Sequence, residues 1–159
     1  MGVTVRSRES KREVMPDLKF VQMRPSSPSL NELESLFKSE WSDFSFCHYH
    51  LELPAPIVAL HGEKVIGGLS FTFYRHPNSN GDVVWINALF ILPEYRGRRI
   101  ADKLIESATL EVARRGYKQL FAYTHIPSIY QRLGWTSLNS KAQSKYKIMS
   151  LELNSHLID

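Results

Sequence analysis

Residues 92–105, LPEYRGRRIADKLI, join an apolar run to a basic amphipathic segment, and their order suits anion binding. Pro93 would end the preceding strand, Gly97 lets a ligand approach the backbone closely, and Arg96 and Arg98 add positive charge. A turn from a buried strand into a helix directs the free N–H groups of the first helical turn beyond the strand, and phosphates bind at such positions. The alternative is an ordinary strand-to-helix connection with solvated arginines, because a single glycine is a weak signal.

Histidine and cysteine are the other residue types whose side chains could take part in a reaction. His48 and His50 lie two apart, and His125 follows the strand-like segment QLFAYT. Histidine exchanges protons near neutral pH, so His125 is a candidate base or substrate contact. No cysteine or carboxylate cluster completes a metal-ligand pattern, and we expect no metal site. Cys47, the only cysteine, excludes an internal disulfide and is expected to be a buried packing residue.

The elements that position these residues follow from apolar periodicity. Residues 18–23 read as a strand, and Ser29 with Glu32 forms a capping-box spacing at the start of a helix that reaches Trp41. From Ile57 the pattern predicts three antiparallel strands joined by hairpins, with Asn80-Gly81 as a turn. The remaining predicted elements are a helix after the basic turn that ends at Gly116, a strand at 119–124, a short helix at 129–133 and a strand at 146–153.

The order strand, turn, helix, strand forms a right-handed crossover. We therefore expect residues 120–124 to run parallel to their partner strand.

Length and composition favour one globular domain over residues 16–159, preceded by a polar, mobile arm at 1–15. No apolar stretch reaches the roughly 20 residues of a membrane helix, and we expect a cytoplasmic protein without a membrane anchor. The net charge is +4, and the positively charged residues lie in local clusters, a distribution that suits anion binding better than nucleic-acid binding. The sequence does not determine the oligomeric state, and a homodimer is one of the options.

The segment FILPEYRGRRIADKLI resembles the acetyl-CoA signature of the GNAT N-acetyltransferase superfamily, which reads Arg or Gln, two residues, Gly, any residue, then Gly or Ala. Arg96 and Ala101 match the two ends, whereas Arg99 stands where the family usually has glycine. The segment IYQRLGW at 129–135 resembles a later element of the same family, built on a tyrosine and Leu-Gly-Phe/Trp. The resemblance covers about residues 18–153.

This resemblance implies an α/β fold with a mixed, mostly antiparallel sheet, helices on both faces, and a splayed pair of parallel strands that forms the acyl-CoA slot. A bulge in strand 83–91 would open that slot. The implied reaction is direct transfer of acetyl from acetyl-CoA to a primary amine of a small molecule or protein. A weakly active or inactive CoA-binding sensor of the same fold is the alternative, motivated by Arg99, by Tyr123 where the family often has Asn, and by the lack of a carboxylate on strand 83–91.

The cofactor-binding residues implied by the resemblance are Phe90, Ile91, Leu92, Arg96, Gly97, Arg98, Arg99, Ile100 and Ala101. The first three would pair through their backbone with the pantetheine arm, and the other six would hold the pyrophosphate mainly through main-chain amides. That cradle is expected to need a right-handed backbone at Arg99. Tyr130 would protonate the leaving thiolate.

The base and the acceptor are less defined. Strand 83–91 offers Asn87 where many relatives carry a carboxylate, with Asp82 at its start, so a water relay is one option and His125 is another. Aromatic side chains could form an acceptor wall or belong to the core; they are Trp41, Phe44, Phe46, Tyr49 and Trp85.

Overall fold

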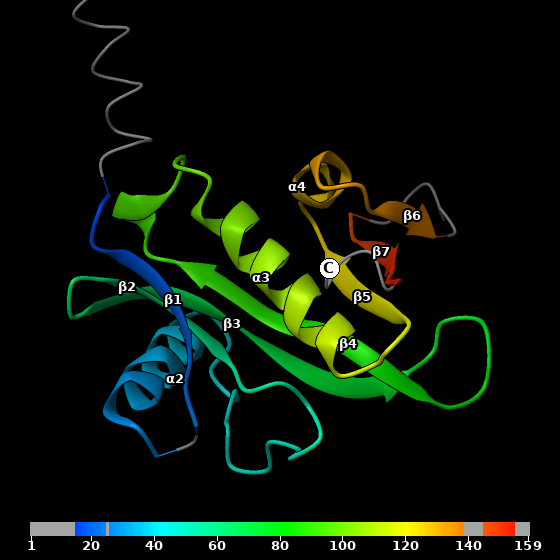
Figure 1. The fold of residues 1–159 in the computed structure, drawn as a ribbon, viewed down its shortest axis with the longest axis horizontal. Helices are drawn as coiled ribbons and strands as arrows, with labels where there is room; N and C mark the ends of the chain where they lie inside the picture. The colour runs from blue at the N-terminus through cyan, green and yellow to red at the C-terminus, as the bar shows by residue number, and fades with distance from the viewer. Residues whose placement is uncertain (1–14, 25, 139–144, 155–159) are drawn as a thin grey trace, which may run out of the picture.

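The computed structural model describes residues 15–24, 26–138 and 145–154. Their strands form one sheet in the order β1-β2-β3-β4-β5-β7-β6 (Figure 1). The strands are β1 (Leu18–Gln22), β2 (Ile57–His61), β3 (Lys64–Arg75), β4 (Asp82–Ile91), β5 (Gln119–Thr124), β6 (Thr136–Leu138) and β7 (Lys147–Glu152). Every neighbouring pair is antiparallel except β4 and β5, which are parallel. The predicted mixed sheet with one parallel pair is confirmed.

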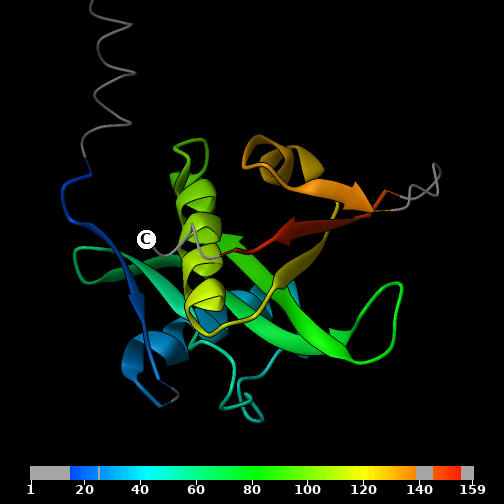
Figure 2. The ribbon, with the colours of Figure 1, turned by 45° about the vertical axis from the view of Figure 1, so that its right-hand side comes forward.

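Helices cover both faces of the sheet, as the resemblance implied. The helical segments are α2 (Pro28–Glu40), the 3-10 turn η1 (Pro93–Tyr95), α3 (Ile100–Arg114) and α4 (Pro127–Arg132). Figures 1 and 2 show α2 behind the sheet and α3 in front of it. Because side chains alternate along a strand, Val65 packs with α2 while its neighbour Ile66 packs with α3. The two hydrophobic clusters thus lie on opposite faces.

The start of α2 differs from the prediction. Ser27 is the N-cap, and its side chain accepts a hydrogen bond of 3.2 Å from the Leu30 N–H. Pro28 occupies the first turn, where its missing N–H has no cost. The predicted capping box of Ser29 and Glu32 is therefore wrong, because the proline starts the helix two residues earlier.

A bulge in β4 separates it from β5. Ala88 and Ile86 of β4 face Ser70 and Phe71 of β3, which leaves Asn87 as the extra residue. The Ser70 hydroxyl donates a hydrogen bond of 2.6 Å to Asn87 Oδ1 and fixes the bulge. β4 and β5 are in register at only two positions, both before the bulge. Figure 2 shows β5 leading up to α4 while β4 turns away, so the predicted splayed pair is confirmed.

Several smaller predictions were tested as well. Strand β6 was missed, because its three residues are too few for a periodic signal. Cys47 is exposed, so its predicted burial is wrong; its neighbour Phe46 takes the inward position. The predicted arm at 1–15 lies almost wholly outside the described residues. Within the described ranges, no helix has the length and apolar character needed to cross a membrane.

Candidate active site

The turn between β4 and α3 holds two residues in the left-handed region. Gly97 has φ 81°, and Arg99 has φ 65° and ψ 22°. The right-handed backbone that the cradle was expected to need at Arg99 is therefore not present. The arginine adopts a conformation that glycine takes freely and that costs other residues on the order of 1–2 kcal/mol. The turn keeps its shape because η1 and the first hydrogen bond of α3, from the Lys103 N–H to the Arg99 carbonyl, hold it on both sides.

This turn aims backbone donors at open space. The N–H groups of Ile100, Ala101 and Asp102 precede the first intrahelical bond of α3 and therefore have no acceptor within the helix. A Cβ built at Gly97 would meet nothing within 4 Å. The positive end of the α3 dipole adds to this donor array. The geometry suits a phosphate or pyrophosphate group.

The two predicted arginines beside Gly97 have different roles. Arg96 turns back along β4: its Nε donates to the Ile91 carbonyl at 2.8 Å, and its guanidinium lies 5.4 Å from the centre of the Phe90 ring. These contacts fasten the turn to the end of the strand. The Arg98 guanidinium instead lies 5.6 Å from the centre of the Tyr95 ring, and Arg98 is not among the residues that line the cavity at this turn.

The polar backbone groups of Leu92 are both used inside the protein. Its N–H donates to the Ile66 carbonyl at 2.8 Å, and its carbonyl accepts from the Tyr95 N–H at 2.9 Å. Because backbone groups alternate sides along an antiparallel strand, those of Phe90 and Leu92 face β3, and those of Leu89 and Ile91 face the gap toward β5. Of the three residues predicted to pair with a pantetheine arm, Ile91 turns its backbone groups to the gap, whereas those of Phe90 and Leu92 are turned to β3.

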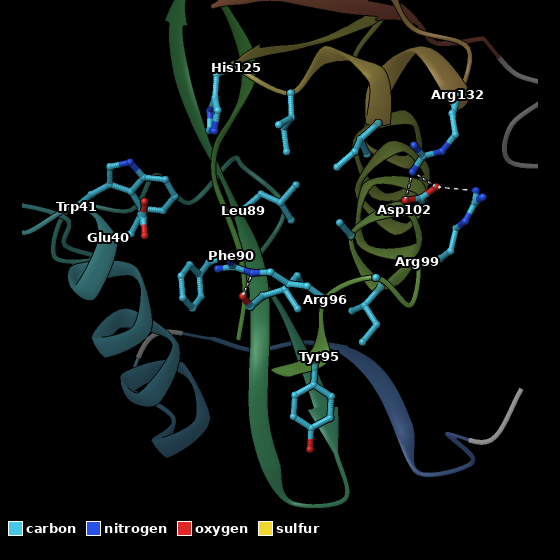
Figure 3. A pocket seen from close by; sticks show the side chains of 16 residues that line it. Glu40, Trp41, Leu89, Phe90, Tyr95, Arg96, Arg99, Asp102, His125 and Arg132 are labelled. Atoms are coloured by element: carbon cyan, nitrogen blue, oxygen red, sulfur yellow. Dashed lines mark hydrogen bonds and ion pairs between the residues drawn. The ribbon is translucent and has the colours of Figure 1, made fainter. Parts of the chain in front are cut away.

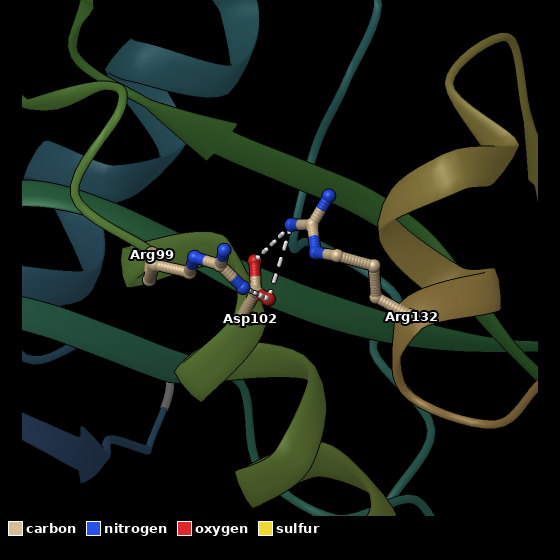
Figure 4. Close-up of polar contacts among 3 residues, drawn as sticks. All are labelled: Arg99, Asp102 and Arg132. Atoms are coloured by element: carbon tan, nitrogen blue, oxygen red, sulfur yellow. Dashed lines mark hydrogen bonds and ion pairs between the residues drawn. The ribbon is translucent and has the colours of Figure 1, made fainter.

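A buried carboxylate stands between two arginines at the start of α3 (Figure 4). Both oxygens of Asp102 accept from Arg132 Nη2, at 2.9 and 3.1 Å, and Arg99 Nη1 lies 3.6 Å from Asp102 Oδ2. Asp102 is buried, whereas about half of each arginine side chain stays exposed. The pair joins α4 to α3 and holds Arg132 beside the turn that precedes α3. Sequence reasoning missed it, because residues 30 positions apart carry no local signal.

Two cavities lie on either side of the gap between β4 and β5. The first has a volume of about 570 Å³ and is lined by the turn, the start of α3, and Arg132 of α4. Figure 3 shows Glu40, Trp41 and His125 on one side of this cavity and Arg99, Asp102 and Arg132 on the other. The second cavity has a volume of about 660 Å³ and lies over Trp85, Asn87 and Tyr123. The residues that line both cavities are Glu40, Trp41, Leu89, His125 and Ile126.

Tyr130 lines the second cavity at the start of the gap. Its ring is buried and packs edge-on against Trp135, with the centroids 4.9 Å apart. Burial raises the pKa of its hydroxyl well above the ordinary value of 10.0, so the group keeps its proton at any physiological pH. The hydroxyl therefore carries a proton that it could donate, although the raised pKa makes it a weaker acid than an exposed tyrosine.

The predicted base candidates occupy different places. His125 directly follows β5, is exposed, and lines both cavities. Asp82 lies at the far start of β4 and lines neither cavity. Tyr123 lines only the second cavity, so it does not stand on the side of the phosphate-binding turn. The sequence did not single out Glu40, the last residue of α2, because a carboxylate at the end of a helix is ordinarily just exposed to solvent.

The predicted aromatic wall divides into two groups. Trp41 and Trp85 line the second cavity, whereas Phe44 and Phe46 pack with each other, centroids 4.9 Å apart, against α2. The buried Tyr49 hydroxyl donates to the Pro54 carbonyl at 2.7 Å, and its pKa is also raised by burial. His48 and His50 line neither cavity. Within the described ranges, no three His, Cys, Asp or Glu residues gather as a metal site.

The sequence model of the Acetyltransferase (GNAT) family matches residues 22–135. The chain belongs to this family. The resemblance stated from the two motifs is thereby confirmed, and the enzyme class is that of an acetyltransferase. By sequence, none of the curated proteins matches this chain at a significant level.

Solved structures share the fold. YhbS of Escherichia coli, in complex with CoA, is 15% identical with a TM-score of 0.66, over 90% of this chain and 85% of that one. Naa50 of Arabidopsis thaliana, in complex with the bisubstrate analogue CoA-Ac-MVNAL, is 13% identical with a TM-score of 0.64, over 85% and 98%. YncA of Salmonella typhimurium, with acetyl-CoA, is 15% identical with a TM-score of 0.66, over 88% and 96%. At these identities the likeness concerns the fold.

Proposed function

We propose that this GNAT-family protein transfers the acetyl group of acetyl-CoA to a primary amine. The observation that carries the proposal is the pair of cavities that meet at Glu40, Leu89 and His125, where β4 and β5 separate. One cavity has the donors and cations that an acyl-CoA needs, and the other stands open to an acceptor. Two reactants brought together at such a junction react without a covalent enzyme intermediate.

The first cavity fits CoA in charge and shape. The N–H groups at the start of α3 would receive the pyrophosphate, with Arg99 and Arg132 at its side. The inward-facing backbone of Leu89 would pair with the pantetheine arm, while the Ile91 carbonyl already accepts from Arg96. Fold relatives that hold CoA, such as YhbS, support this assignment.

Acetyl-CoA supplies the acetyl group as a thioester, so a carbon–nitrogen bond forms while the carbon–sulfur bond breaks. The ammonium form of the amine gives up two protons in all; one replaces the acetyl group on sulfur and one leaves to solvent. His125 would take the first proton from the amine, a role that its position in the lining of both cavities supports. Tyr130, which lines the second cavity and keeps its proton, would protonate the sulfur. Cys47 lines neither cavity and has no part in the transfer.

The test combines ligand binding with turnover. Acetyl-CoA should raise the melting temperature by more than a matched adenine nucleotide without the pantetheine arm. With an accepted amine, release of the CoA thiol should fall about 10²-fold in Tyr130→Phe, since the hydroxyl alone is removed. Tyr117→Phe is the matched control, because Tyr117 lines neither cavity. A protein that binds acetyl-CoA but releases no thiol with any amine would be a sensor of the same fold.

A further inference from the structure

We infer that the acceptor is a small monoamine with an aromatic body, an assignment that rests on the acetyltransferase function proposed above. The second cavity carries the argument through its rings, its charges and its place relative to the phosphate-binding turn. The rings favour an aromatic body, the charge disfavours polyamines and amines with a carboxylate, and the position orients the amine.

Aromatic rings dominate the wall of the second cavity. The rings are those of Trp41, Tyr74, Trp85, Tyr123, Tyr130 and Tyr146. Six large hydrophobic residues are exposed in the described part of the chain, and five of them line this cavity; Leu51 is the exception. Tyr74 and Tyr123 are 67% and 60% exposed, and exposed apolar side chains gathered in one cavity are typical of a binding surface. A wall of this kind stabilises a planar apolar body by stacking.

The charge on the wall selects a single cation. Among the lining residues of the second cavity that the structure describes, Glu40 is the one carboxylate, and none is a lysine or arginine. A protonated amine therefore finds one ion-pair partner and faces of aromatic rings. A polyamine would bring further ammonium groups without partners, and an amine that carries a carboxylate would find no cation, so both would lose affinity.

The positions of these groups orient the amine. Glu40 and His125 line both cavities, so an ammonium beside them stands at the junction where the thioester is expected. The stacked rings of Tyr123 and Tyr146 lie beyond this point, with centroids 4.9 Å apart and planes 18° apart. The body of the acceptor would extend from the junction along these rings. A cavity of about 660 Å³ has the size of a small-molecule site.

The first experiment measures CoA-thiol release with four probes: 2-phenylethylamine, spermidine, glutamate, and a peptide with a free amino terminus and one lysine. We expect 2-phenylethylamine to give the highest kcat/KM, about tenfold or more above the others, because one unpaired charge costs at least that factor. A higher value for spermidine or glutamate would overturn the assignment. A higher value for the peptide would assign the cavity to a chain end instead.

Variants test which residues recognise the acceptor. Glu40→Gln should raise the KM for 2-phenylethylamine about fivefold while the KM for acetyl-CoA stays nearly unchanged, because only the amine carries the partner charge and an exposed ion pair contributes up to about 1 kcal/mol. Glu32→Gln is the matched control on the same helix, exposed and outside both cavities. Tyr123→Thr should reduce the preference for 2-phenylethylamine over n-hexylamine. An unchanged KM in Glu40→Gln would contradict the role of the carboxylate.

The outcomes separate this inference from the proposed function. If acetyl-CoA binds and spermidine is the best acceptor, the acetyltransferase function stands and the aromatic-amine assignment is wrong. If acetyl-CoA causes no thermal shift, the proposed function itself is wrong. If acetyl-CoA binds but no amine is turned over, saturation-transfer NMR of 2-phenylethylamine on the CoA complex decides, since the absence of a signal overturns the assignment.

Discussion

The close approach of β3 to β4 at Gly67 gives the sharpest test of how this fold positions its site. Gly67 stands opposite Ile91, and a Cβ built at Gly67 would lie 2.3 Å from the Phe90 carbonyl oxygen and 2.9 Å from Ile91 Cδ1. Contacts below 3.0 Å are essentially absent around real Cβ atoms. Gly67→Ala must therefore push β4 away or bend β3, and the nearest atom belongs to the backbone, which yields less than a side chain.

The expected cost follows from this geometry. Overpacking a core costs about 1–3 kcal/mol, and the main-chain contact places this change at the upper end. Alanine recovers about 0.5–1 kcal/mol because it loses less entropy on folding than glycine. The net loss of unfolding free energy is about 2 kcal/mol, which corresponds to a melting temperature about 4–8 °C lower for a domain of this size.

Activity should fall in the same variant. Phe90 and Ile91 lie at the end of β4 beside the first cavity, and misplacement by about 1 Å can cost about 10²-fold in rate. Thermal unfolding and CoA-thiol release measure the two effects. Gly62→Ala is the control: Gly62 has φ 63° but open space around its Cβ, so we expect a backbone cost of about 1 kcal/mol and full activity. A Gly67→Ala protein with wild-type stability and kcat/KM would refute the reasoning.

Two further predictions concern buried polar groups. Because burial raises the pKa of Tyr49 and Tyr130 in the folded state, unfolded tyrosine ionises first, and stability should be complete below pH 10.0 and fall above it by about 1.4 kcal/mol per pH unit for each residue. Urea unfolding between neutral and strongly alkaline pH should show a smaller decline in Tyr49→Phe, and an equal decline would contradict the burial argument. Asp102→Asn should lower the unfolding free energy by about 1–2 kcal/mol. A double-mutant cycle of Asp102→Asn with Arg132→Met should show a coupling energy of about 1 kcal/mol. The cycle with Arg99 should show a smaller one, because the Arg99 side chain is more distant and more exposed. Additive effects in the Arg132 cycle would show that the ion pair does not contribute to stability.

Local patterns in the sequence determined most of the secondary structure and the phosphate-binding turn. Apolar alternation predicts the long strands, helical spacing predicts α2 and α3, and Gly116 ends α3 as expected, with φ 88°. The turn at 92–105 and the tyrosine of IYQRLGW are read from short segments, since a proline, a glycine or a helix start acts on its immediate neighbours. The two motifs were sufficient to identify the family before any contact between distant residues was known.

Tertiary structure alone decided which residues face the reactants. Whether Leu89 or Leu92 presents its backbone groups to the gap depends on the pairing of β4 with β3. A register shift of one residue would turn the backbone groups of every residue in β4 to the opposite side. Glu40 joins His125 at the junction of the cavities only because α2 and β5 end at the same place. The sequence specifies periodicity within a segment, whereas a site assembled from several elements depends on how their surfaces pack, which no single segment encodes.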